Sequence, residues 1–101
     1  MKEDLLTIIK HYGIENQLKY IHSEYFELDE AILDYEQAGF DFSDEDCKNI
    51  EKEYKNHIIE ELADIMVMLE QFRIYYGISL GEVGEIMNYK IKRQIERIEK
   101  E

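Results

Sequence analysis

The chain has 101 residues, of which 24 are acidic and 12 basic, giving a formal net charge of −12. This length predicts one domain spanning residues 1–101. The charge excludes non-specific nucleic-acid binding, which needs Lys and Arg to neutralise phosphates. The longest uninterrupted apolar run covers residues 65–69, too short to span a membrane. The first residues lack a signal-peptide apolar region, and the lone Cys47 cannot form an internal disulfide, so we expect a cytoplasmic protein.

Two amphipathic helices are predicted in the first 40 residues. The first covers about residues 2–12, has Leu5, Ile8 and Ile9 on one side, and ends at Gly13. The second covers about residues 15–38 and ends before Gly39. Its apolar residues alternate at spacings of three and four, as in a bundle helix: Leu18, Ile21, Tyr25, Leu28, Ile32 and Tyr35.

Helical character resumes at Ser43, a candidate N-cap, and continues to Tyr76. Because this stretch is long for one helix, we expect a break near residues 47–55 and a well-defined helix over 56–76. The predicted core-facing residues of that helix are Ile58, Leu62, Ile65, Leu69 and Phe72. Ser79 and Glu82 form a capping-box pattern, which predicts a last helix ending near residue 99.

No segment alternates with the period of a β-strand, so the predicted fold is all-α, an antiparallel bundle of about four helices. Eight tyrosines and four phenylalanines are many for so small a bundle to bury. We therefore expect self-association through helix faces, with a solvated aromatic rim as the alternative.

Four carboxylates are candidate metal ligands because of their positions on two helices. Acids three residues apart are common at this acid content, so spacing alone is weak evidence. On a helical wheel, however, Glu61 points toward the predicted core and Asp64 lies at its edge. Glu24 flanks the seam of the preceding helix, and Glu27 lies one step further out. Because carboxylates near a core need a partner, and hard divalent cations prefer oxygen ligands, these residues predict a metal site.

Two alternatives remain for these acids. Glu61 could instead pair with an inward Lys or Arg, and Glu24 and Glu27 could form a solvated helix flank. Lys90, Arg93 and Arg97 form a basic stripe on the last helix. This stripe either complements the helix dipole or binds phosphate, and bases facing metal-binding acids are typical of a triphosphate site.

Three segments resemble the MazG-like all-α nucleoside triphosphate pyrophosphohydrolases: QLKYIHSEYFELDEAI (17–32), EELADIMVMLEQF (60–72) and KIKRQIERI (90–98). The family motifs are E-E-x-x-E and E-x-x-D on successive helices. Here they correspond to residues 23–27, with Ser23 in place of the first glutamate, and to residues 61–64. The similarity extends from about residue 5 to residue 98.

This resemblance implies a Mg²⁺-dependent hydrolase, with Mn²⁺ as a substitute, that cleaves a nucleoside triphosphate to the monophosphate and diphosphate in nucleotide-pool control or house-cleaning. It implies Glu24, Glu27, Glu61 and Asp64 as metal ligands and catalytic residues, with Glu24 or Glu27 assisting deprotonation of the attacking water. It also implies that Lys90 and Arg93 bind phosphate and that the protein is a homodimer or homotetramer.

Two departures from the family pattern keep other functions open. Ser23 removes one carboxylate, and the acidic segment 41–55, a potential lid or dimer contact, lengthens the gap between the motifs. The main alternative is a non-catalytic MazG-like module that binds nucleotide or a protein partner, and a weaker one is a structural bundle with solvated acids. The sequence does not rank bases or sugars, although Tyr20, Phe26 or Tyr89 could stack on a base.

Overall fold

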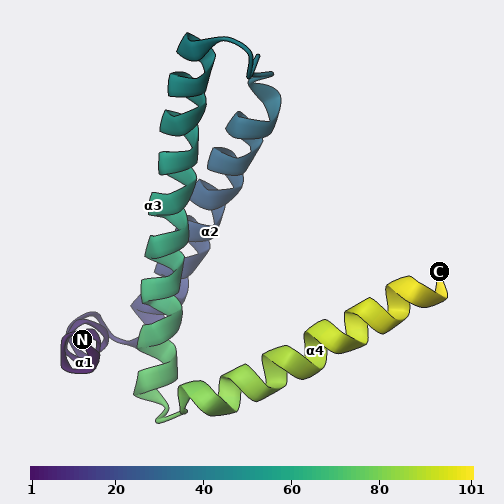
Figure 1. Ribbon diagram of the computed structural model, residues 1–101. Helices are drawn as coiled ribbons and strands as arrows, with labels where there is room; N and C mark the ends of the chain where they lie inside the picture. Colours follow the sequence, from purple (N-terminus) through teal and green to yellow (C-terminus); the bar gives the residue numbers. More distant parts are fainter.

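The computed structural model describes residues 1–101 and contains four α-helices and no strand. The helices are α1 (Lys2–Tyr12), α2 (Ile14–Gln37), α3 (Glu45–Tyr75) and α4 (Leu80–Lys100). Figure 1 shows α2 and α3 as a long antiparallel hairpin, α1 against its lower end, and α4 projecting away from it. The all-α prediction with four helices is confirmed. None of these helices is long and apolar enough to cross a membrane.

The α3 helix is continuous, so the expected break near residues 47–55 is wrong. Its N-cap is Asp44, whose side chain accepts a hydrogen bond from Asp46 N at 2.9 Å, and not Ser43. The first turns of α3 are held against α2 by an aromatic cluster in which Phe40 contacts Tyr35 and Tyr54. These contacts stabilise a helical segment that its polar sequence alone would leave marginal.

The turn between α3 and α4 is fixed by backbone and side-chain hydrogen bonds. Gly77, at φ 66°, donates to Ile74 O, and Ile78 N donates to Arg73 O, which together form a Schellman motif. The Arg73 guanidinium also donates to Ile78 O at 2.8 Å. The predicted capping box of Ser79 and Glu82 is confirmed at the start of α4.

The seam between α2 and α3 differs from the predicted one at three of its six positions on α2, each of which is displaced by one residue. Buried or half-buried residues recur there at alternating spacings of four and three: Gln17, Ile21, Glu24, Leu28, Ala31 and Tyr35. Leu18, Tyr25 and Ile32, predicted as core residues, are exposed, and on α3 Leu62 and Leu69 are exposed as well. Small Ala31 allows close approach of the helices where a bulky residue would separate them.

The buried core is small and partly polar. Only nine residues are buried, and four of them are Gln17, Glu24, Glu61 and Gln71. Gln17 Nε2 donates to Gln71 Oε1 at 2.8 Å, and both amide nitrogens lie beside Met68 Sδ, at 3.9 and 3.8 Å. This amide pair joins α2 to α3 at the end of the hairpin that α1 covers.

The amide pair predicts a non-additive pattern of stability changes. Gln17→Met leaves the Gln71 oxygen buried without its donor and should lower the free energy of unfolding by about 1–3 kcal/mol. Gln17→Met/Gln71→Met replaces both partners with side chains of similar shape and should lose less than the sum of the two single variants. Urea denaturation measures all three variants, and simple additivity would contradict the prediction.

Candidate metal centre

The hairpin brings together the four carboxylates predicted from the sequence. Glu24 and Glu27 lie on α2, Glu61 and Asp64 lie on α3, and one oxygen from each can be chosen so that all four lie within 4.8 Å of one another. Residues three apart share one side of a helix, so each pair presents both of its carboxylates toward the neighbouring helix.

Burial divides these carboxylates into an inner and an outer pair. Glu24 is 5% exposed and Glu61 8% exposed, whereas Glu27 and Asp64 are exposed. The core-facing placement of Glu61 and the outer placement of Glu27 are confirmed, and Glu24 lies deeper than the flank position expected for it. The cluster therefore has an interior side and a solvent side.

Each inner carboxylate has one oxygen without a partner. Glu24 Oε2 and Glu61 Oε2 are buried and accept no hydrogen bond. The expected alternative for Glu61, an ion pair with Lys or Arg, is wrong, because its neighbour is His57 Nε2 at 3.4 Å from Oε1. The alternative of a solvated flank is wrong for Glu24. Unpartnered buried carboxylate oxygens are costly, and a bound cation would satisfy them.

The electrostatics of the cluster also favour a cation. Burial raises the pKa of Glu24, and the charges of Glu27 and Asp64 add to this effect, while a hydrogen bond from Tyr20 opposes it. The charge of Glu61 raises the pKa of Glu27. The charges of neighbouring carboxylates thus make ionisation of Glu24 and Glu27 harder, which a divalent ion would reverse. Four oxygen donors suit Mg²⁺ or Mn²⁺.

A cavity of about 400 Å³ adjoins the carboxylates on one side of the hairpin. Its wall includes Glu24 and Asp64, and its remaining lining residues come from α1, α2 and α3: Ile8, Tyr12, Gln17, Tyr20, Val67, Met68 and Gln71. Gln17 and Gln71 were not predicted from the sequence as site residues. A signal for Gln17 was present, because it lies seven residues before Glu24 and so on the same face of α2.

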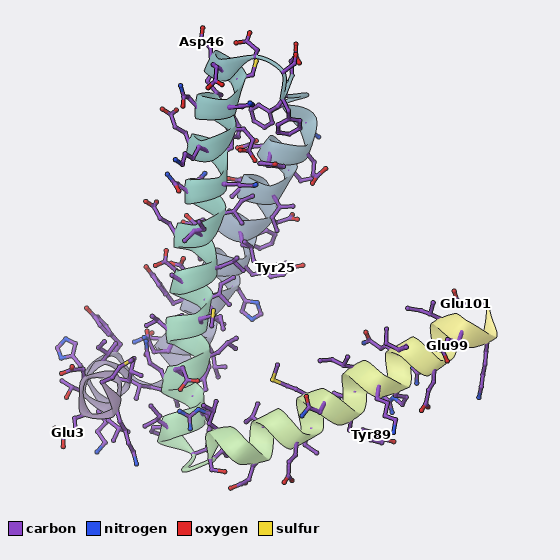
Figure 2. The ribbon with its side chains drawn as sticks, in the orientation of Figure 1. Glu3, Tyr25, Asp46, Tyr89, Glu99 and Glu101 are labelled. Carbon is purple, nitrogen blue, oxygen red and sulfur yellow. The ribbon has the colours of Figure 1, made fainter.

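Lys90 and Arg93 are not brought to the cluster within one chain. Both lie exposed on α4, which has no buried residue, and the Arg93 guanidinium lies 5.7 Å from the centre of the Tyr89 ring. Figure 2 shows Tyr89 on the projecting α4, well apart from Tyr25 on the hairpin. The acidic segment 41–55 lies at the end of the hairpin away from α1 and α4, where Figure 2 labels Asp46.

Comparison with protein-family models, with curated proteins and with solved structures finds no match to this chain. The MazG-like resemblance therefore stays a prediction.

The raised pKa values predict how stability changes with pH when metal is absent. A carboxyl group whose pKa is higher in the folded state destabilises that state when ionised, and this penalty is relieved as pH falls through the folded pKa. In EDTA, lowering the pH from about 8 to about 5.5 should raise the melting temperature of the wild type more than that of Glu24→Gln/Glu27→Gln. Asp41, Glu51 and Glu70 have lowered pKa values and stay ionised in this window.

Differential scanning fluorimetry of both proteins at both pH values makes this measurement. The comparison removes contributions shared by the two proteins. Equal pH responses would contradict the prediction.

Proposed function

We propose that this protein is a Mg²⁺-dependent nucleoside triphosphate pyrophosphohydrolase of the MazG-like type, with Mn²⁺ as a substitute, acting in the cytoplasm. The main support for this proposal is that two buried oxygens, Glu24 Oε2 and Glu61 Oε2, have no hydrogen-bond partner within a cluster of four carboxylates. The adjoining cavity offers room for the organic part of a substrate.

Each carboxylate would have a role set by its burial. Glu24 and Glu61 would hold the ion from the interior, and Glu27 and Asp64 would complete the site from the solvent side. When bound, the ion would draw charge from the phosphate oxygens and acidify a water molecule. Glu27 is exposed whereas Glu24 is buried, so the Glu27 carboxylate is the better placed of the α2 pair to accept a proton from the attacking water.

A second candidate is a MazG-like module that binds nucleotide or a protein partner without turnover. Ser23 favours it, because this exposed residue stands where the motif has a further carboxylate. In that case the cluster would still bind Mg²⁺, but hydrolysis would be absent. The two candidates make the same prediction for metal binding and opposite predictions for turnover.

Diphosphate release from a panel of ribo- and deoxyribonucleoside triphosphates with Mg²⁺ tests the enzyme proposal. Glu61→Gln should reduce turnover and Mg²⁺ affinity by at least about 100-fold, because it neutralises a buried ligand without changing its shape. Glu60→Gln is the matched control, because Glu60 is next to Glu61 in the sequence but is exposed and lies outside the cluster. This variant should keep both turnover and Mg²⁺ affinity.

The outcomes separate the candidates. Mg²⁺ should raise the melting temperature of the wild type and of Glu60→Gln but not of Glu61→Gln. That shift without turnover of any triphosphate would favour the non-catalytic module. No turnover together with equal Mg²⁺ shifts in all three proteins would overturn the metal site itself.

We further propose that the protein is a homodimer, or a homotetramer if two surfaces are used. The apolar face of α4 is uncovered, and its members are exposed: Leu80, Met87, Ile91, Ile95 and Ile98. An exposed apolar surface of this extent is unusual for a monomer of this size, and a second copy can cover it with the same surface. Self-association would also allow Lys90 and Arg93 of one copy to approach the carboxylates of another.

The hairpin carries a second uncovered apolar surface, formed by Leu18, Tyr25, Ile32, Leu62, Met66 and Leu69. On each helix these residues come one position after residues of the buried seam. They are therefore rotated about the helix axis by roughly a quarter to a third of a turn, in the same sense on both helices. Because α2 and α3 are antiparallel, equal rotations place both sets on one side of the hairpin. Tyr20 and Gln71, which line the cavity, are rotated in the opposite sense.

Light scattering coupled to size-exclusion chromatography tests the oligomer. The wild type should elute as a dimer or tetramer, and Ile91→Asp should lower the mass by at least about half, because a charge in an apolar interface is strongly unfavourable. Tyr89→Asp is the matched control on the opposite side of α4 and should leave the mass unchanged. A wild type that is monomeric at every concentration would contradict the prediction.

A further inference from the structure

We propose that the cavity beside the carboxylate cluster binds a nucleobase, and that the side-chain amides of Gln17 and Gln71 read its hydrogen-bonding edge. The identification of the ligand as a nucleotide rests on the proposed function. The binding chemistry of the cavity rests on its own lining.

The cavity is placed to receive a group attached to a metal-bound phosphate chain. Glu24 and Asp64 belong both to its wall and to the carboxylate cluster. Its volume of about 400 Å³ lies within the range of about 300–1,000 Å³ typical of small-molecule sites. A ligand in this cavity would therefore lie directly beside the metal ligands.

The buried amides retain hydrogen-bonding capacity that the protein does not use. Gln17 is 6% and Gln71 2% exposed, and Gln17 Oε1, which is not fully buried, accepts no hydrogen bond from any protein donor. Besides the Gln17–Gln71 bond, their N–H groups face only Met68 Sδ, and a thioether sulfur is a weak acceptor. A base edge with one donor beside one acceptor would donate to Gln17 Oε1 and accept from an amide N–H of the pair.

The remaining wall suits a flat aromatic ring. Tyr12 and Tyr20 supply aromatic faces from α1 and α2, and Ile8, Val67 and Met68 supply apolar contacts. Tyr20 lines the cavity together with Glu24, and this carboxylate raises the pKa of the Tyr20 hydroxyl. Of the three aromatic residues that the sequence left unranked, only Tyr20 lines the cavity, and Phe26 and Tyr89 are exposed elsewhere.

A titration with nucleosides alone tests the cavity without any catalysis. The ¹⁵N-labelled wild type is titrated with uridine, cytidine, adenosine and guanosine and their deoxy forms, and the side-chain amide signals of glutamine are followed by NMR. At least one nucleoside should shift the signals of Gln17 and Gln71, assigned with Gln17→Met and Gln71→Met. The exposed Gln94 on α4 is an internal control and should not move. No shift with any nucleoside overturns the proposal.

A binding comparison tests the role of the amides. With Mg²⁺, the wild type should bind the preferred triphosphate, its α–β bridging oxygen replaced by an imido group, at least about tenfold more tightly than inorganic tripolyphosphate. Gln17→Met/Gln71→Met should lose this preference, remain folded and keep its affinity for tripolyphosphate. A double variant that folds and keeps the base preference overturns the proposal.

These results distinguish failure of the cavity from failure of the enzyme proposal. Shifted Gln17 and Gln71 signals without turnover would leave the base site standing and remove the hydrolase. Turnover without shifted signals or base preference would do the reverse. If tripolyphosphate does not bind, the nucleoside titration alone decides.

Discussion

The burial of Glu24 and Glu61 between α2 and α3 is the constraint on which the rest of the structure depends. Two carboxylates in a helix interface repel each other and lack water, so the interface must be held together elsewhere. The Gln17–Gln71 amide bond holds one end. At the other end Tyr35 donates to Glu51 at 2.6 Å, and Lys55 pairs with the same carboxylate at 2.9 Å. The acids thus lie between two hydrogen bonds that join α2 to α3 and oppose separation of the helices.

This arrangement links the site to the stability of the fold. Of nine buried residues, four are polar, and two of those are carboxylates of the cluster, so the candidate site occupies a large share of the core. A cation bound there would remove an unfavourable term of the folded state and would stabilise the hairpin directly. The same burial that makes the metal-free site costly makes its ligands rigid, because side chains packed between helices have few alternative rotamers.

Helical periodicity and capping residues were sufficient to predict the four helices, the Ser79–Glu82 capping box and the inward placement of Glu61. Periodicity could not choose between two adjacent stripes of α2, each repeating every seven residues. Hydrophobicity favours Leu18, Tyr25 and Ile32, whereas packing buries Gln17, Glu24 and Ala31. The choice depends on partners from α3, namely Gln71 for the amide and the other carboxylates for Glu24, and these pairings are tertiary. The continuity of α3 has the same origin, since Phe40 supports its first turns from outside the helix.

The stripe of α2 formed by Leu18, Tyr25 and Ile32 is as apolar as a buried seam, yet it is exposed. Its exposure points to a surface that another chain could cover. A hairpin has two sides, and here the cavity and its amides lie on one while Leu18, Tyr25, Leu62 and Leu69 lie on the other. A second copy covering the apolar side would leave the entrance to the carboxylates open. The two sets would then serve different purposes: the polar residues of the inner seam would build a site within the chain, and the apolar residues outside it would join chains without blocking that site. In such an assembly α4, which projects from the hairpin, would be free to extend from one copy toward the open side of another.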